Sequence, residues 1–277
     1  MKEYLINLTL DDQNSSHFKI VNMIAPNSKV FDVGCAAGYF GEYLFKEMNC
    51  EMVGLDINPV HIAESQKTGA YKALFNINLD DDAVNLDEYN GYFDYILLAD
   101  VVEHLYNPQK IIAKLKPLLN PNGRILFSIP NISHACIKLK LLNNLFEYTQ
   151  YGLLDSTHIR FFTLDSIIKM FNNLEMQIED MQFVYYGEST FDQKNNVAKF
   201  PKDIIKYIQS TPQSYIYQYI LAVKPSLESD FVEKNNHFVD IVNNDTEHKA
   251  YKYNIFLGNK IQKEISRFVS KIKNKMK

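Results

Sequence analysis

One stretch constrains the fold of this chain more than any other: Val30-Phe31-Asp32-Val33-Gly34-Cys35-Ala36-Ala37-Gly38-Tyr39-Phe40-Gly41. A short apolar run leads into a turn of small residues, after which aromatic and apolar residues return at helical spacing. This pattern predicts a buried strand that feeds a helix through a tight loop. The N–H groups at the start of such a helix suit the polar end of a nucleotide-like ligand.

The glycine spacing limits which ligand the loop fits. A dinucleotide-binding loop reads G-x-G-x-x-G, and its second glycine lets the backbone approach the pyrophosphate. Here Ala36 replaces that second glycine, and Tyr39 stands in place of the third. The spacing therefore favours a ligand without phosphates and disfavours the alternative of an NAD-dependent oxidoreductase.

Apolar runs and helical patterns alternate after this loop. Strands are predicted at 50–56, 73–78, 92–100 and 124–129. This alternation predicts an α/β fold with a doubly wound, mostly parallel sheet that binds ligands at the carboxyl ends of its strands. Asp32, Asp56 and Asp100 fall at or near such ends. Asp56, about twenty residues past the loop, is predicted to accept hydrogen bonds from ribose hydroxyls.

Two motifs resemble those of the class I S-adenosylmethionine-dependent methyltransferases. The loop at 32–38 is similar to the family's D-x-G-C-x-x-G, and D-V-V-E-H-L at 100–105 is similar to its D-V-L-E-H-[LV]. The resemblance covers about residues 14–225. It implies a seven-stranded Rossmann-like sheet with an antiparallel last strand. It also implies S-adenosylmethionine as the cofactor and S-adenosylhomocysteine as the product.

The resemblance further implies where the cofactor is bound. Polar residues such as His17 would help to hold its carboxylate, although a plain helix N-cap is the alternative for the run at 14–17. Either Asn76 or Asn78 would bind the adenine amino group. The expected cofactor-binding residues are His17, Asp32, Gly34, Cys35, Ala36, Gly38, Tyr39, Asp56, Ile57, Asn76, Ile77, Asn78, Ala99, Asp100, Val101 and His104.

Residues 132–162 are predicted to form a lid or substrate segment, helical from 132 to 151. The D-x-T-H-x-R-F-F-T run at 155–163 resembles a methyltransferase subgroup found with glycan and lipid modification systems. A hydroxyl acceptor must lose its proton, and histidine is the usual base near neutral pH. We expect His158 to be this base, Asp155 to orient it, Arg160 to meet an anionic substrate group and His104 to shape the pocket. The alternative is that His158 only holds the loop together.

Composition excludes several other classes. The net charge of -4 argues against a general nucleic-acid binder. The three cysteines, Cys35, Cys50 and Cys136, form no C-x-x-C pair, so neither a disulfide framework nor a metal site is expected. No signal peptide or membrane-spanning stretch is recognisable, and a cytoplasmic protein is the default. The Asn-, Ile- and Lys-rich usage favours an AT-rich bacterial genome.

The chain is predicted to divide into a methyltransferase domain (1–225), a polar linker (226–248) and a basic amphipathic helix (249–277). Such a helix could lie on an anionic inner-membrane surface or dock a partner. The alternative is that it packs on its own domain or across a homodimer.

The leading function is O-methylation of a sugar, a glycan or a lipid-linked intermediate, as in polysaccharide biosynthesis. One alternative is another acceptor, such as a quinone, a natural product or a nitrogen atom. The other is a non-catalytic S-adenosylmethionine-binding scaffold that acts through the basic tail.

Overall fold

The computed structural model describes residues 8, 10–81, 85–190, 199–226, 228 and 230–244. Within them lies a seven-stranded sheet in the order β3-β2-β1-β4-β5-β7-β6. Five strands pair in parallel: β1 (Lys29–Val33), β2 (Glu51–Asp56), β3 (Tyr71–Asn76), β4 (Phe93–Ala99) and β5 (Leu119–Pro130). The strand β7 (Ile216–Pro225) is antiparallel to both of its neighbours, β5 and β6 (Met176–Tyr185). The predicted doubly wound sheet with an antiparallel last strand is confirmed.

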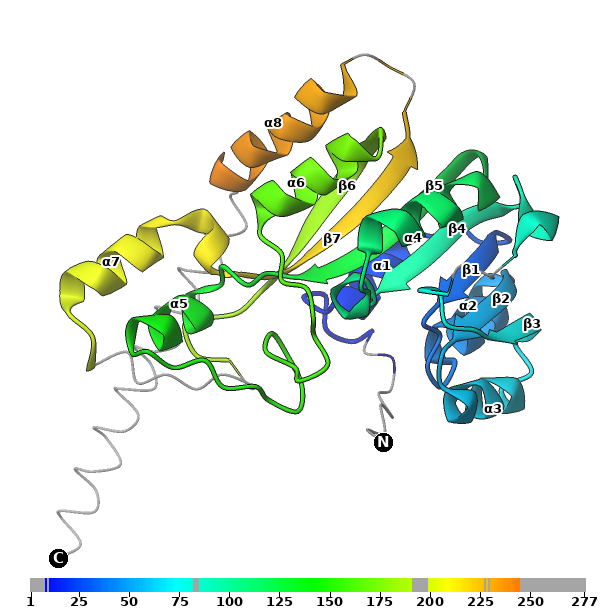
Figure 1. Cartoon of the computed structure of the whole chain (residues 1–277), viewed down its shortest axis with the longest axis horizontal. Helices are drawn as coiled ribbons and strands as arrows, with labels where there is room; N and C mark the ends of the chain where they lie inside the picture. Colours follow the sequence, from blue (N-terminus) through cyan, green and yellow to red (C-terminus); the bar gives the residue numbers. More distant parts are fainter. Residues whose placement is uncertain are drawn as a thin grey trace, which may run out of the picture.

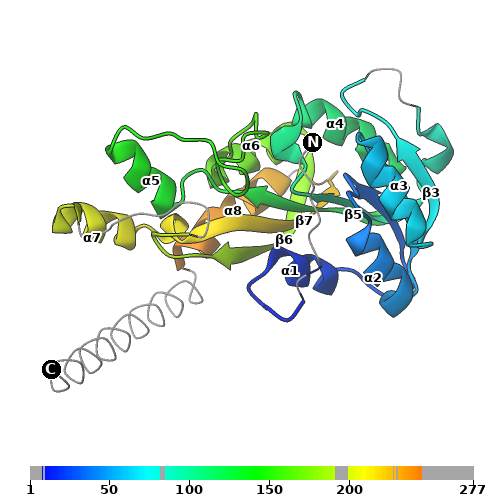
Figure 2. The same cartoon turned by 90° about the horizontal axis from the view of Figure 1, so that it is seen from below.

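Helices cover both faces of this sheet (Figures 1 and 2). One face carries α1 (Ser16–Asn22) and α2 (Tyr39–Met48). The other carries α4 (Pro108–Leu115), α6 (Leu164–Asn173) and α8 (Phe231–Asn244). The short α3 (Pro59–Lys67) packs against β2 and β3. Because both faces are covered, the central strands are apolar on both sides, as in other parallel sheets.

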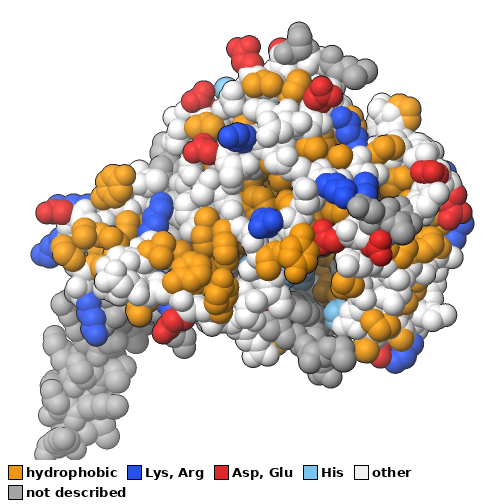
Figure 3. Space-filling view, viewed as in Figure 1, with side chains coloured by type: hydrophobic (Ala, Val, Ile, Leu, Met, Phe, Trp, Pro, Cys, Tyr) orange, Lys and Arg blue, Asp and Glu red, His pale blue; other side chains and the backbone are white. Residues whose placement is uncertain are grey.

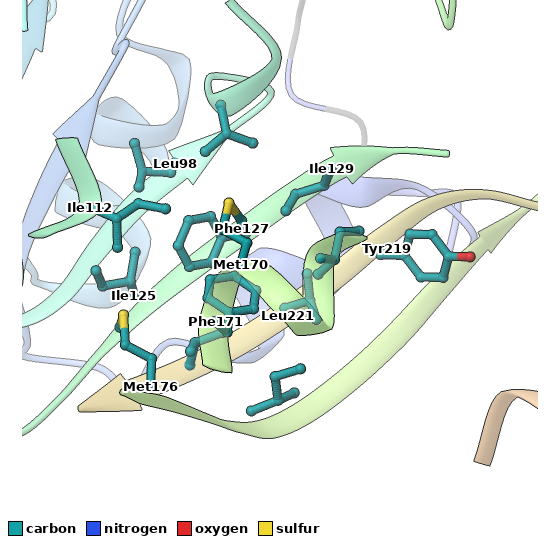
Figure 4. Close-up of a cluster of buried hydrophobic side chains, with 14 of the residues drawn as sticks. Leu98, Ile112, Ile125, Phe127, Ile129, Met170, Phe171, Met176, Tyr219 and Leu221 are labelled. Carbon is teal, nitrogen blue, oxygen red and sulfur yellow. The ribbon is translucent and has the colours of Figure 1, made fainter. Parts of the chain in front are cut away.

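The larger core lies between the sheet and α4 and α6 (Figure 4). Phe127 of β5 and Phe171 of α6 meet there with ring centroids 5.1 Å apart. The buried positions of α6 repeat at helical spacing, as its sequence predicts. Thr163 caps this helix in a reciprocal pair with Ser166.

Two other helices begin at capping side chains. Ser15 is the N-cap of α1, where its hydroxyl accepts the Phe18 N–H at 3.1 Å. Asn58 caps α3 through the Val60 N–H, and Pro59 occupies the first helical position. Both follow from local chemistry, because these side chains replace backbone partners that a helix start lacks.

The segment after β5 differs from its prediction. The helix α5 spans only Ala135–Leu142, so a helix from 132 to 151 was wrong beyond residue 142. Asn144 has a φ of 57°, which ends the helical path. Leu139 is buried against α7 (Lys202–Ser210), whereas Leu142 and Phe146 are 54% and 44% exposed.

The predicted linker over 226–248 is also corrected, because α8 occupies most of it and packs on β6 and α6. Asn235, on α8, is fully buried. Its Oδ1 accepts the Ile178 N–H at 2.7 Å, and its Nδ2 donates to the Met176 carbonyl at 2.8 Å. This asparagine thus binds the backbone of β6, a role that its polar sequence context did not reveal.

The predicted basic helix at 249–277 lies outside the described residues. Among the helices that are described, none has the length and apolar character that a membrane crossing requires.

Candidate active site

A cavity of about 1030 Å³ opens at the carboxyl ends of β1, β2 and β4, where the strand order reverses between β1 and β4. Ligands of doubly wound sheets bind at this kind of position. Most of the residues predicted for the site line the cavity: His17, Asp32, Gly34, Cys35, Ala36, Tyr39, Asp56, Ile57, Ile77, Asn78, Ala99, Asp100, Val101, His104, Asp155 and His158. Gly38, Asn76 and Arg160 do not.

The loop between β1 and α2 is held in an unusual backbone path. Gly34, Ala36 and Gly38 have φ values of 74°, 47° and 85°. A Cβ on Gly34 would lie 2.8 Å from Cγ2 of Val101, which is too close. The glycine therefore leaves the space that Val101, from the D-V-V-E-H-L motif, occupies. Ala36 adopts a conformation that disfavours a side chain, which implies that its surroundings hold it there.

Asp56 supplies part of that support. Its Oδ2 accepts the Ala36 N–H at 2.9 Å, and its Oδ1 accepts the Asn58 N–H at 2.7 Å. Nδ1 of His61 lies 3.3 Å from the same Oδ1. A carboxylate offers about four lone-pair positions, so Asp56 can still accept hydrogen bonds from a ligand in the cavity.

Asp32 is 3% exposed and accepts the Tyr71 hydroxyl at 2.7 Å. Burial raises the pKa of Asp32 to about 6, although the Tyr71 hydrogen bond acts in the opposite direction. Burial also raises the pKa of the neighbouring Cys35 thiol, which is therefore neutral.

Three predicted site residues lie away from the cavity lining. Gly38 is the N-cap of α2. Asn76 donates to the backbone carbonyls of Asp56 and Ile57, so Asn78 is the adenine candidate that reaches the cavity. Arg160 donates to the Tyr106 carbonyl. Contacts with adenine and with an anionic substrate group stay predictions.

The D-V-V-E-H-L motif forms a turn that meets the distant segment at 155–163. The short helix η2 (Val102–His104) follows β4, and the Glu103 carbonyl accepts the N–H groups of Ile159 and Arg160 at 2.9 and 3.0 Å. This contact brings the rings of His104 and His158 to a centroid distance of 4.9 Å. The structure thus brings together two histidines that the sequence placed in separate motifs.

His158 lies among backbone and carboxylate groups of two segments. Its Nδ1 lies 3.2 Å from the Leu153 carbonyl oxygen, and its Nε2 lies 4.0 Å from Oε1 of Glu103. Asp155 was expected to orient this ring with its carboxylate. The Asp155 carboxylate accepts the Thr157 N–H and hydroxyl, and its carbonyl accepts the His158 N–H. Its orientation of the ring stays a prediction.

Glu103 is a site residue that the sequence analysis missed. It is 1% exposed, and neither carboxylate oxygen has a hydrogen-bond partner among the described residues. Burial, with Asp100 and Asp155 nearby, raises the pKa of Glu103 well above its usual range. Its place in the second motif, directly before His104, was the available signal.

Asp100 shows a second missed set of contacts. Its Oδ1 accepts the Ser128 hydroxyl at 2.8 Å and the Gln218 side-chain amide at 2.7 Å. Because Ser128 and Gln218 come from β5 and β7, the antiparallel strand takes part in fixing the motif at the end of β4.

Comparison with known families identifies this fold and site. A methyltransferase domain family matches residues 15–180, more than half of the chain. The chain belongs to this methyltransferase family. It is accordingly an S-adenosylmethionine-dependent methyltransferase, as its two motifs predicted.

Similar proteins include two named ubiquinone biosynthesis O-methyltransferase. The one from Shewanella halifaxensis is 23% identical over 192 residues, which cover 68% of this chain and 75% of the relative. The mitochondrial one from Schizosaccharomyces pombe is 24% identical, with 66% and 67% covered. At these identities the chain shares the family with them, and their names do not fix its acceptor.

Solved structures show the same fold. A putative methyltransferase from Bacillus halodurans has a TM-score of 0.52 at 13% identity, with 76% of this chain and 98% of that chain covered. A methyltransferase in complex with the Trm112 activator from Haloferax volcanii has a TM-score of 0.51 at 12% identity, with 78% and 92% covered.

Proposed function

We propose that the protein transfers the methyl group of S-adenosylmethionine to a hydroxyl group of a small-molecule acceptor. The observation that carries this proposal is the shared cavity. The Gly34–Gly38 loop and Asp56 line one part of it, and Glu103, His104 and His158 line another. A cavity of about 1030 Å³ is at the upper end of the range for ligand pockets, which leaves room for an acceptor beside the cofactor.

In this proposal the strand ends bind successive parts of the cofactor. Asp32 and the loop hold its cationic methionine end, because a carboxylate attracts the ammonium group. Asp56 accepts the ribose hydroxyls, and Ile77 and Asn78 lie along the adenine. The methyl group then points toward the Asp100–His104 turn.

The transfer itself is an in-line displacement. The acceptor oxygen forms a bond to the methyl carbon, the carbon–sulfur bond breaks, and its electron pair stays on a sulfur that becomes neutral. The hydroxyl proton must leave. The cluster of Glu103, His104 and His158 can promote its loss in two ways: His158 accepts it, as the sequence predicts, or a cation held by the cluster acidifies the hydroxyl.

Two acceptor classes have support. A sugar, glycan or lipid-linked hydroxyl is favoured by the resemblance of the run at 155–163 to a glycan-associated subgroup. A ring hydroxyl of a quinone precursor is favoured by the relatives named ubiquinone biosynthesis O-methyltransferase. Tyr151, Tyr186 and Tyr217 line the cavity and offer aromatic faces to a ring of either class.

Calorimetric titration with S-adenosylmethionine and S-adenosylhomocysteine tests the cofactor site. We expect Asp56→Asn to weaken both affinities by about 10- to 100-fold, since hydrogen bonds to a charged acceptor contribute about 1.5–3 kcal/mol. Asp87→Asn, on an exposed turn, is the matched control. Unchanged affinity in Asp56→Asn would contradict this binding mode.

Labelled methyl transfer to a panel of sugars, lipid-linked glycans and catechol-type quinone precursors tests the acceptor. Transfer to one class identifies it. Cofactor binding without transfer to any member would instead support the scaffold alternative.

A further inference from the structure

Three side chains of types that ligate metals lie together in the cavity, next to the predicted position of the methyl group. Glu103, His104 and His158 each offer a ligand atom, and these atoms all lie within 4.8 Å of one another. We propose that the three residues bind a divalent transition-metal ion, which in turn binds the acceptor hydroxyl. The role of the ion in the reaction rests on the proposed function, whereas the metal site itself does not.

The buried Glu103 carboxylate is the first argument. Its two oxygens lack hydrogen-bond partners among the described residues, and the side chain is 1% exposed. A buried polar group without a partner is costly, and a buried charge more so. Asp100 and Asp155 add negative charge nearby. Without a cation this environment holds the carboxyl group in its protonated form, whereas a bound cation would stabilise the carboxylate. No lysine or arginine of the described residues lines the cavity to do so.

The tautomers of the two histidines are the second argument. Nδ1 of His158 lies 3.2 Å from the Leu153 carbonyl oxygen, and Nδ1 of His104 lies 3.1 Å from the Thr157 carbonyl oxygen. A carbonyl only accepts hydrogen bonds, so each Nδ1 carries a hydrogen and each Nε2 of the neutral ring carries the lone pair. Backbone carbonyls orient metal-ligating histidines in this way.

The contact between His158 and Glu103 follows from these tautomers. Nε2 of His158 lies 4.0 Å from Oε1 of Glu103, which is too far for a hydrogen bond between them but close enough for both atoms to bind one ion. Ligands bonded at about 2.0–2.2 Å to one ion lie roughly 3–3.5 Å apart, so the two atoms need to approach by no more than about 1 Å. Small side-chain rotations achieve this.

The donor set indicates which metal fits. Two imidazole nitrogens and one carboxylate oxygen suit zinc, iron, cobalt or manganese, whereas magnesium and calcium prefer oxygen ligands. Three protein ligands also leave coordination positions open, as in catalytic rather than structural zinc sites. An acceptor oxygen can occupy one of them.

A bound ion would change how the hydroxyl is activated. Coordination lowers the pKa of an oxygen-bound proton, which then passes to solvent. The resulting oxygen anion attacks the methyl carbon, and the carbon–sulfur electron pair returns to the sulfur. His158 then acts as a ligand and not as a base, and His104 acquires a direct role.

Metal binding is tested with the full-length protein after removal of metals by a chelator. Cobalt(II) is titrated and followed by visible absorption, and zinc(II) is titrated by calorimetry. We expect one equivalent of each to bind, with a cobalt absorption spectrum that the free ion lacks. In Glu103→Gln and His158→Gln, affinity should fall by about 100-fold or more, because loss of a ligand exceeds the 10- to 100-fold effect of outer-shell changes. Glu103→Gln keeps the side-chain volume, so it should fold.

His237→Gln is the control, because this histidine lies on α8 with its side chain 69% exposed. Absence of saturable binding, or equal binding by Glu103→Gln and the unchanged protein, would overturn the metal site. S-adenosylmethionine affinity, measured on the same samples, distinguishes this failure from failure of the proposed function. Full methyl transfer by metal-free protein would overturn the catalytic role and return His158 to the role of base.

Discussion

Asp32 illustrates how its surroundings set the chemistry of a single side chain. The residue lies on β1, two positions before Gly34, where it is buried and accepts a hydrogen bond from Tyr71. Burial disfavours the charged carboxylate and raises its pKa to about 6. The proposed cofactor carries positive charge, so it should bind the ionised form of Asp32 more tightly than the protonated form.

This difference predicts a pH dependence of cofactor binding. Because the pKa of Asp32 is raised, the carboxyl is protonated below about pH 6 and ionised above it. S-adenosylmethionine affinity should therefore be constant above pH 7 and fall by up to about tenfold per pH unit below 6. Calorimetry from pH 5 to 8 measures it. The Asp32→Asn variant should bind S-adenosylmethionine more weakly and show no fall in affinity below pH 6. If the variant shows the same steep fall, another group is responsible for the titration.

At the scale of elements, α8 shows that a polar segment can be an integral part of the fold. Its Asn235 donates to Met176 and Asn172 and accepts from Ile178, next to a register irregularity between β6 and β7. The side chain replaces a strand partner that β6 lacks at its edge. The helix is thereby fixed to the outer strand of the sheet.

Removal of this side chain should destabilise the protein without affecting the active site. In Asn235→Ala, a buried N–H and a buried carbonyl of β6 lose their partner, at about 1–3 kcal/mol each. We expect the free energy of unfolding to fall by about 2–4 kcal/mol, as measured by urea denaturation. Asn236→Ala is the matched control, because Asn236 is the next residue on the same helix and its side chain is exposed. Equal stability of the two variants would show that α8 is not firmly docked.

At the scale of the whole molecule, the site opens on a face with exposed apolar side chains. Figure 3 shows hydrophobic side chains gathered around α5 and the segment that follows it. Leu141, Leu145, Phe146 and Tyr148 are among them, each more than 40% exposed. Single apolar side chains are common on protein surfaces, whereas a group of neighbouring ones marks an interaction site. This patch would suit an acceptor that is attached to a lipid.

The basic C-terminal sequence leads to a prediction about location. Residues 249–277 contain nine Lys and Arg against the single Glu264, and each basic residue near an anionic membrane contributes about 1 kcal/mol. We expect the full chain to co-sediment with anionic vesicles, less so at high salt, and a chain truncated after residue 248 to bind much less. Neutral vesicles are the control. Binding unchanged by truncation would contradict this role, and a change in oligomeric state instead would favour docking between copies.

The sequence alone determined the alternation of strands and helices and most of the residues on the cofactor side of the cavity. The β1–α2 loop and the N-caps at Ser15 and Asn58 depend on residues close in the chain, and Asp56 was placed by its position at the end of a predicted strand. Turn chemistry and hydrophobic periodicity are local properties, so they can be read without the fold. The family resemblance supplied the antiparallel last strand, which periodicity could not orient.

Tertiary structure alone decided how the other side of the cavity is built. The Glu103 carbonyl accepts the backbone N–H groups of Ile159 and Arg160, and this contact sets Glu103 beside His158. No residue spacing predicts it, because the two segments lie far apart in the chain and their meeting depends on how residues 155–163 pack. The docking of α8 on β6 through Asn235 has the same origin. A buried carboxylate and its neighbours are defined by packing, which only the folded chain provides.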